Sequence, residues 1–301
     1  MARENKTSPV IGVLPLFQIK GMIKAHISNG LFGAYASVLA DCAEARTALI
    51  EHAQKMIKKE RIRYLLLKTL EDPFHSKPEG FYTMDSWVIA TLQLNPDPSF
   101  MWDGLRDKIR NCVRKALKHG LEVRTEKKYL PHFYDVLADN MHRKGAPIYG
   151  YEFMKGILDG FGNRSEIITV WSGGEIVSGA MVLNHRETVY VPFASSRPWA
   201  LHMSPNNLLY WEIIRQSCLR GMNTLDFGRS MKGTGSLAFK LGWGAQESPQ
   251  PCLIYSKDGT EINFDPHQRG VGWLINQWKR LPRNFADRLG PLVCKQIAGL
   301  L

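Results

Sequence analysis

Two stretches of this chain repeat the same order of predicted elements, and this repeat limits the fold more than any other feature. In the first half, β-branched and apolar runs precede a helical stretch, "CAEARTALIEHAQKMIKKE" (42–60), and a short strand, "RYLLLK" (63–68). In the second half, a β-meander precedes "SPNNLLYWEIIRQSCLRG" (204–221) and "NTLDFG" (223–228). Each helix would have about five turns. The repeat predicts two similar halves of mixed helices and strands.

The elements between these stretches set the expected domain boundaries. Residues 166–171, 176–184 and 188–195 are β-prone runs separated by turn residues, which predicts the meander. Residues 81–94 predict a single extended strand, and residues 100–120 predict one amphipathic helix that links the halves. We expect an N-terminal half over 1–100, a linking basic helix over 101–125, a C-terminal domain over 126–265 and a basic amphipathic tail over 266–301.

The charge balance indicates an anionic partner. The chain has 301 residues and a formal net charge of +11, while its apolar content of 44% is typical of a globular protein. Such a surplus of lysine and arginine favours a nucleic acid, a phosphorylated substrate or a membrane surface, without distinguishing among them. The five cysteines form no Cys-x-x-Cys pair and the histidines are scattered, so we expect buried, reduced thiols and no metal site.

The two ends of the chain bear on its location. The first residues, "MARENKTSPVIGVLP", lack the apolar core of a signal peptide, and no uncharged stretch is long enough to span a bilayer. We therefore expect a cytoplasmic protein. The tail, "GVGWLINQWKRLPRNFADRLGPLVCKQIAGLL" (270–301), mixes tryptophan and leucine with basic residues. That mixture is typical either of helices packed on their own domain or of a peripheral contact with the inner face of a membrane.

Two glycine-rich matches to nucleotide-binding motifs lack the context that those motifs require. The stretch "GTGSLA" (233–238) has the spacing of a dinucleotide fingerprint, but a meander precedes it in place of a βαβ unit. The stretch "GRSMKGTG" (228–235) lacks the Gly-Lys-Ser/Thr ending of a P-loop. What remains is a basic, glycine-rich loop that can present backbone N–H groups to an anion.

The segment from Ser204 to Gln246 carries the most specific pattern. It combines a Pro-Asn-x-Leu-Leu-Tyr-Trp helix, an Asp-Phe-Gly-Arg-Ser strand and a glycine-rich stretch, with Pro205, Asn206, Leu208–Trp211, Asp226–Ser230, Gly233, Gly235, Phe239, Lys240, Trp243 and Gly244. This combination strongly resembles the C-terminal half of FemAB-related proteins, in particular the branch associated with PEP-CTERM (exosortase) systems in Gram-negative bacteria. The upstream segments "VIGVLPLFQIKG", "SVLAD", "IRNCVRKALKHGLEVR" and "GAPIYGYEFMKGIL" are similar to the family too, so the resemblance covers nearly the whole chain.

The resemblance implies a fold and a reaction. The fold is α/β with mixed α+β sheets, built as two tandem GNAT-like (acyl-CoA N-acyltransferase-like) domains, of which the first is expected to lack its N-terminal elements. The reaction is transfer of an acyl or aminoacyl group from aminoacyl-tRNA or acyl-CoA to an amine of a cell-envelope, peptidoglycan or exopolysaccharide-related substrate, without a tightly bound cofactor. GNAT enzymes bind the CoA pyrophosphate at a glycine-containing loop. The matching loop, "SSRPWALHMSPN" (195–206), has no glycine, which favours another donor.

Candidate roles follow for the polar residues of these segments. We expect Asp226 to accept or relay the amine proton and Arg229 to hold an anionic group, as catalytic residues. We expect the substrates to contact Arg110, Arg114, Tyr149, Asn206, Asn207, Tyr210, Lys232, Lys240 and Trp243. Each has a structural alternative. These are an ion pair between Asp226 and Arg229, a solvated face for the two helix arginines, capping by the asparagines, and a packed tryptophan beside a snorkelling lysine.

Two other function classes remain open at this point. An incomplete first domain would fit a non-catalytic binding protein of an exopolysaccharide or protein-sorting locus. The net charge would fit an RNA-binding protein, whose affinity would fall steeply with salt. Measured turnover separates the enzyme from both alternatives.

Overall fold

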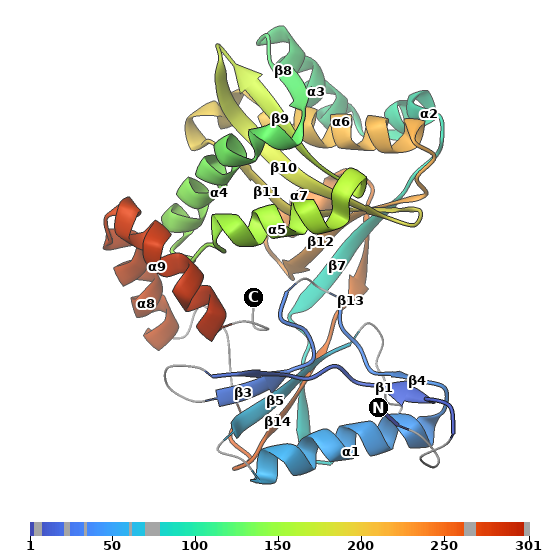
Figure 1. Ribbon diagram of the computed structural model, residues 1–301. Coiled ribbons are helices and arrows are strands. Elements are labelled where there is room, and N and C mark those ends of the chain that lie inside the picture. The colour runs from blue at the N-terminus through green and yellow to red at the C-terminus, as the bar shows by residue number, and fades with distance from the viewer. Residues whose placement is uncertain are drawn as a thin grey trace. The chain divides into compact units, whose positions relative to one another are not determined.

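The chain forms two compact units in a computed structural model that describes residues 1–2, 8–20, 25–32, 35–59, 62–69, 79–261 and 269–297 (Figure 1). Unit 1 comprises Met1–Val88, Pro249–Gln268 and Leu292–Leu301. Unit 2 comprises Ile89–Ser248 and Arg269–Pro291. Each unit has its own sheet, so each is described by itself.

Unit 1 is built on a five-stranded sheet in the order β2-β3-β5-β14-β6. Strands β3 and β5 are parallel and the remaining pairs are antiparallel. Helix α1 makes the crossover between β3 and β5, and its buried face packs against the sheet. The elements are β1 (Gly12–Val13), β2 (Phe17–Ile19), β3 (Ala25–Ser28), β4 (Leu39–Ala40), α1 (Ala43–Lys59), β5 (Ile62–Lys68), β6 (Phe81–Met84) and β14 (Cys252–Ser256).

Unit 2 is built on a seven-stranded sheet in the order β13-β7-β12-β11-β10-β9-β8. Strands β8 to β11 form antiparallel pairs, whereas β11 and β12 are parallel. Its strands are β7 (Trp87–Gln93), β8 (Glu122–Thr125), β9 (Ser165–Ser172), β10 (Glu175–His185), β11 (Thr188–Ser196), β12 (Thr224–Met231) and β13 (Gln246–Pro249).

Helices cover both faces of the unit 2 sheet (Figure 1). Helices α4 and α5 lie on one face, and α6 lies on the other with α3 packed behind it. The helices are α2 (Pro98–Gly104), α3 (Asp107–Lys118), η1 (Lys127–Tyr129), α4 (Leu130–Lys144), α5 (Tyr151–Phe161), η2 (Gly162–Arg164), η3 (Pro198–Met203), α6 (Pro205–Leu219), α7 (Gly235–Gly242), α8 (Arg269–Arg280) and α9 (Arg283–Gln296).

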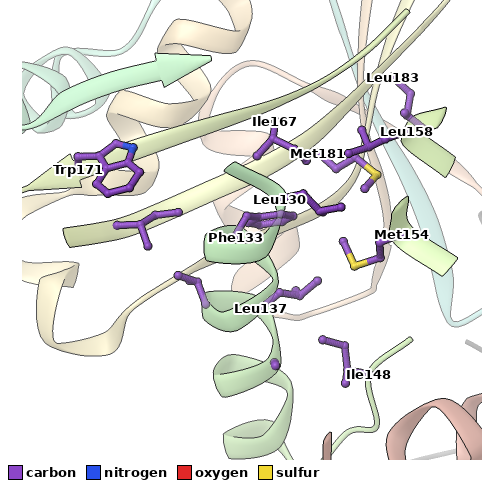
Figure 2. Close-up of a cluster of buried hydrophobic side chains, with 13 residues drawn as sticks. Leu130, Phe133, Leu137, Ile148, Met154, Leu158, Ile167, Trp171, Met181 and Leu183 are labelled. Atoms are coloured by element: carbon purple, nitrogen blue, oxygen red, sulfur yellow. The ribbon is translucent and has the colours of Figure 1, made fainter. Parts of the chain in front are cut away.

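The hydrophobic core between α4 and the sheet fixes the meander in unit 2. Figure 2 shows Phe133 and Leu137 of α4 directed at the strands that carry Ile167 and Met181. Gly179 of β10 lets the helix come close, because a Cβ atom there would lie 2.8 Å from the Phe133 ring. Truncating Phe133, which is fully buried, to alanine would cost about 3–5 kcal/mol.

The predicted repeat is confirmed. In each unit an antiparallel pair, β2–β3 or β10–β11, leads into a long helix and then into a parallel strand, β5 or β12. Two element predictions are wrong. The single strand over 81–94 is divided into β6 and β7, which belong to different sheets. The single helix over 100–120 is divided into α2 and α3, because Leu105 is buried with an extended backbone at ψ 144°.

Candidate active site

The candidate site lies where the parallel strands β11 and β12 of unit 2 part. Their pairing covers only Thr188↔Thr224, Val189↔Leu225 and Tyr190↔Asp226, although β11 continues to Ser196 and β12 to Met231. Backbone N–H and C=O groups that are released from a ladder can pair with an extended ligand. The parting of the strands therefore offers a place for a substrate chain.

The local chemistry of β12 explains why the pairing stops at Asp226. The Asp226 side chain, 1% exposed, accepts a 2.6 Å hydrogen bond from the backbone N–H of Gly228. Gly228 has a φ of +73°, which glycine adopts at little cost and which bends the strand. An aspartate that bonds to the backbone two residues ahead is a turn-forming device, placed here inside a strand.

Lys240, on helix α7, binds the backbone of this bend in β12. Helix α7 begins at its N-cap Thr234, whose hydroxyl accepts from the Leu237 N–H, and carries Lys240 in its last turn. The Lys240 Nζ donates to the carbonyl of Gly228 at 2.9 Å and to that of Arg229 at 3.1 Å. Burial lowers the pKa of Lys240 to about 8, and the negative charge of Asp226 opposes that shift. The expectation of a snorkelling lysine is wrong, because this ammonium group is held inside the protein.

An aromatic cluster of Tyr210, Phe227, Phe239 and Trp243 packs α6 and α7 against β12. The Tyr210 ring stacks on Phe227 with centroids 5.2 Å apart and meets Phe239 at 5.3 Å. Trp243 is 2% exposed and lies 6.2 Å from Phe239. Burial raises the pKa of the Tyr210 hydroxyl, so it stays protonated. Among the described residues, the indole N–H of Trp243 has no hydrogen-bond partner.

Asn206 fixes the start of α6 to the far end of β11. Its Oδ1 accepts from the Ser178 hydroxyl of β10 at 2.8 Å, and its Nδ2 donates to the Ser196 hydroxyl of β11 at 3.1 Å. The predicted capping role is therefore wrong for Asn206. The N-cap position belongs to Ser204, which has a left-handed backbone and makes no side-chain cap bond. The half-buried Asn207 donates its backbone N–H to the Ser204 carbonyl.

The other predicted residues lie at varying places in unit 2. Tyr149 stacks on Phe153 and meets Phe193 of β11, in the part of that strand beyond its pairing with β12. Half-buried Arg229 lies on β12, and exposed Lys232 lies in the turn after it. On α3, Arg110 pairs with Asp107, and Arg114 lies over the Trp102 ring at 5.6 Å. The stretch from Trp102 to Asn111, far in sequence from Asp226 and Lys240, supplies partners to both α3 arginines.

The loop between β11 and α6 is curled into η3 and offers few donors to a pyrophosphate. Pro198 and Pro205 have no N–H group, and the N–H groups of Ala200 and Ser204 donate to carbonyls of the same loop. Phosphate-binding loops instead direct several free N–H groups at the anion. This loop has no glycine, and its positions 198, 200, 204 and 205 present no free N–H group.

Metal binding and membrane spanning find no structural support in the described ranges. No group of three or more His, Cys, Asp and Glu side chains gathers there to hold a metal ion. The helices of the same ranges are all too short or too polar to cross a membrane. Cys218, Cys252 and Cys294 are buried as expected, but the expectation of burial is wrong for Cys42, which is exposed.

Sequence reasoning missed three residues that shape the site. Gly228 bends β12, Ser178 orients Asn206, and Phe193 meets Tyr149. The Asp-x-Gly spacing from Asp226 to Gly228 was a signal for the first, because that spacing is typical of turns. The other two are brought into place only by the pairing of β10 with β11.

Comparisons with known proteins agree with this fold. Residues 104–241 match the family model of the acetyltransferase (GNAT) domain. A comparison with curated proteins gives no match. Among solved structures, FemX is similar with a TM-score of 0.62 at 14% identity, over 84% of this chain and 87% of FemX. L-PGS from Bacillus licheniformis is similar with a TM-score of 0.54 at 11% identity, over 88% of this chain and 84% of that one.

A tandem GNAT protein from the clavulanic acid biosynthesis pathway is also similar. Its TM-score is 0.52 at 11% identity, over 86% of this chain and 82% of that protein. At such identities the similarity is evidence for the fold alone. The chain thus contains an acetyltransferase (GNAT) domain over residues 104–241 and has the mixed α/β fold of tandem GNAT proteins.

Proposed function

We propose that this chain is an N-acyltransferase of the FemAB/GNAT type, which transfers an acyl or aminoacyl group to an amine of a cell-envelope or exopolysaccharide-related substrate. The observation that carries the proposal is the buried ammonium group of Lys240 beside the parting strands β11 and β12. The GNAT domain match over residues 104–241 supports the reaction class. The association with PEP-CTERM loci rests on the sequence resemblance alone.

The reaction needs a neutral amine and a stabilised oxyanion. The amine lone pair attacks the acyl carbon, and the carbonyl oxygen becomes negatively charged as the tetrahedral intermediate forms. The intermediate collapses when the bond from the acyl carbon to the donor oxygen or sulfur breaks. The amine loses one proton and the leaving group gains one, so the transfer is balanced without any redox partner.

Lys240 is suited to stabilise that oxyanion. An ammonium group has three N–H donors, and the carbonyls of Gly228 and Arg229 accept from two of them. We propose that the third N–H and the positive charge face the acyl oxygen of the substrate. Because the group is buried and already held in place, it needs no reorganisation when charge develops, and one such donor is typically worth about 3 kcal/mol.

Asp226 is then a positioning residue as well as a candidate proton acceptor. It holds the Gly228 N–H and thereby the bend that brings two carbonyls to Lys240. Its charge also keeps the pKa of Lys240 from falling further. Arg229 and Lys232 follow on the same strand and turn, and we propose that they hold an anionic group of a substrate.

Aminoacyl-tRNA is the donor that the observations favour over acyl-CoA. The η3 loop lacks the glycines of a pyrophosphate site, and the N–H groups of Ala200 and Ser204 are bound within the loop. The net charge of +11 suits a large polyanion. A further similar structure, with a TM-score of 0.54 at 10% identity, is named as the C-terminal domain of a lysylphosphatidylglycerol synthetase from Agrobacterium fabrum, a name that describes an aminoacylated product. We extend that chemistry to this chain as part of the proposal.

The proposal is tested by offering both donors to the purified full chain. Transfer of label from charged tRNA and from acetyl-CoA to a pool of cell-envelope precursors is compared for the wild type, Asp226→Asn and Arg229→Ala. The proposal is supported if the wild type transfers label from charged tRNA and the folded variants transfer less. Transfer from acetyl-CoA alone would reject the donor assignment, and no transfer from either donor would favour a binding protein.

A further inference from the structure

Helix α8 is held on unit 2 by one side only. Ile275 packs on Gly145 at the end of α4, where a Cβ atom would lie 2.6 Å from the Ile275 Cγ2. The His142 imidazole forms a 2.9 Å hydrogen bond with the Leu281 carbonyl just after the helix. These contacts fix the rotation of α8 about its axis, and so they also fix which side chains point away.

The part of α9 that belongs to unit 2 is held in the same way. Arg283 pairs with Asp135 of α4 and with Asp287 at 3.4 Å. Ala286 is 2% exposed, and Gly290 lies so close to Ile148 that a Cβ atom would come within 3.0 Å of its carbonyl oxygen. Residues 283, 286, 287 and 290 share one side of a helix, so the opposite side is left uncovered.

The uncovered sides of both helices are apolar. On α8, Trp273 and Leu274 are each 61% exposed. On α9, Phe285 is 62% exposed and Leu289 is 37% exposed, one helical turn apart. Single exposed apolar residues are ordinary on a protein surface, but large aromatic and leucine side chains repeated on two consecutive helices indicate an interaction surface.

Basic residues accompany this apolar surface. Residues 269–291 include five basic residues (Arg269, Lys279, Arg280, Arg283, Arg288) and one acidic residue (Asp287), a balance of +4. The acidic residue faces Arg283 on the docked side. Arg280 and Arg288 are exposed on the uncovered sides, whereas Lys279 lies beside Ile275 against Gly145. The uncovered sides therefore combine tryptophan, phenylalanine and leucine with positive charge.

We infer that Trp273, Leu274, Phe285 and Leu289, with Arg280 and Arg288, form a docking surface for an anionic phospholipid bilayer. We call this set the α8–α9 face. Its charge is complementary to anionic headgroups, and its aromatic and leucine side chains can enter the boundary between headgroups and acyl chains. Each basic side chain near such a surface strengthens binding by roughly fivefold. Docking there would hold the enzyme at the membrane, where envelope precursors carried on lipids are found.

The test is co-sedimentation of the full chain with vesicles of phosphatidylcholine alone and with vesicles that also contain phosphatidylglycerol. We expect binding to the anionic vesicles that weakens as salt is added, because screening reduces the attraction. Trp273→Ser with Phe285→Ser should reduce binding at least tenfold, and Arg280→Glu with Arg288→Glu should reduce it by a similar factor. Because all four side chains are exposed, the circular dichroism spectra should match the wild type.

Matched control variants distinguish binding through this surface from nonspecific binding. Phe100→Ser removes an aromatic side chain that is 64% exposed on α2, and Lys118→Glu reverses an exposed charge on α3. Both controls should bind like the wild type. Equal binding to neutral and anionic vesicles, or equal losses in the controls, would overturn the inference. So would a concentration-dependent dimer that the α8–α9 substitutions abolish while vesicle binding is absent, because the face would then bind a second copy. Vesicle binding is read without substrate, so its outcome is independent of transfer activity.

Discussion

The Nζ atom of Lys240 lies 2.9 Å from the carbonyl oxygen of Gly228, and this bond joins a buried cation to the bend of strand β12. The same glycine donates its N–H to Asp226, so one residue links an anion and a cation through its two backbone groups. The bend, the end of strand pairing and the placement of a positive charge thus have a common origin. Changes at Asp226, Gly228 and Lys240 should therefore affect one another.

Two substitutions distinguish the hydrogen-bonding role of the Asp226 side chain from the role of its charge. Asp226→Ala leaves the Gly228 N–H without its acceptor in a buried place, which should destabilise the fold by about 1–3 kcal/mol. Asp226→Asn keeps an oxygen acceptor and loses only the charge that opposes the lowering of the Lys240 pKa, so it should be destabilised less than Asp226→Ala. Urea unfolding of the two variants measures this difference. Equal losses of stability in both would mean that the charge of Asp226, rather than its hydrogen bond, maintains the bend.

Stability should rise with pH through the titration of Lys240. Its pKa is lowered from 10.5 to about 8 by burial, so the unfolded chain binds more protons between these values. The contribution of Lys240 is therefore complete above about pH 10.5 and is lost as the pH falls through about 8, with a total of about 3 kcal/mol. Lys240→Met should lack this gain. The difference in unfolding free energy between wild type and variant, followed from neutral to alkaline pH, reports it, and a constant difference would reject the shift.

The rate of transfer should fall over the pH range in which stability rises, because both depend on the protonation of Lys240. If the charged ammonium group stabilises the oxyanion, the rate of transfer should fall as the pH rises through about 8. Asp226→Asn removes the charge that raises this pKa, so the alkaline decline should begin at lower pH. Single-turnover rates across the alkaline range test both statements. A decline at the same pH in both proteins would assign the titration to another group.

Ser204 stores backbone strain at the start of α6. Its φ of 60° and ψ of 43° are left-handed, and its side chain makes no cap bond that would compensate. Ser204→Gly should therefore stabilise the protein by up to about 1 kcal/mol. Ser86→Gly is a control at an exposed position without positive φ and should lower the stability. Thermal unfolding of the two variants distinguishes them, and a loss of stability in Ser204→Gly would show that the serine is needed there.

Much of the fold could be predicted from the sequence because its periodic elements are long. The meander over 166–195 and the crossover helix over 205–219 have strong patterns of apolar residues, and both are confirmed. The predictions failed where the chain changes direction inside an apolar run. The local composition does not change between Met84 and Trp87, where the chain passes from one sheet to the other, or at Leu105, where the helix is broken. Tertiary packing therefore determines both features.

The candidate site was predicted in outline, and its geometry was not. The sequence singles out the segment from Ser204 to Gln246; within it Asp226 acts on the charge of Lys240, and the Tyr210 ring lies 6.5 Å from the Trp243 ring. The inward direction of Lys240 could not be foreseen, since it depends on two backbone carbonyls that a bend exposes. The catalytic roles of Asp226 and Arg229 stay predictions, as do the substrate-binding roles of Arg110, Arg114, Tyr149, Asn206, Asn207, Tyr210, Lys232, Lys240 and Trp243.

The most direct test of the account is transfer of a labelled aminoacyl group from charged tRNA by wild type, Lys240→Met and Lys118→Met. Lys118 is an exposed lysine on α3 and provides the matched control. We predict that Lys240→Met loses about 10²–10³ in rate, the typical effect of removing one preorganised oxyanion partner, while Lys118→Met keeps the wild-type rate. Both variants should show the circular dichroism spectrum of the wild type. Wild-type transfer rates in a folded Lys240→Met protein would contradict the central claim that this buried ammonium group serves the reaction.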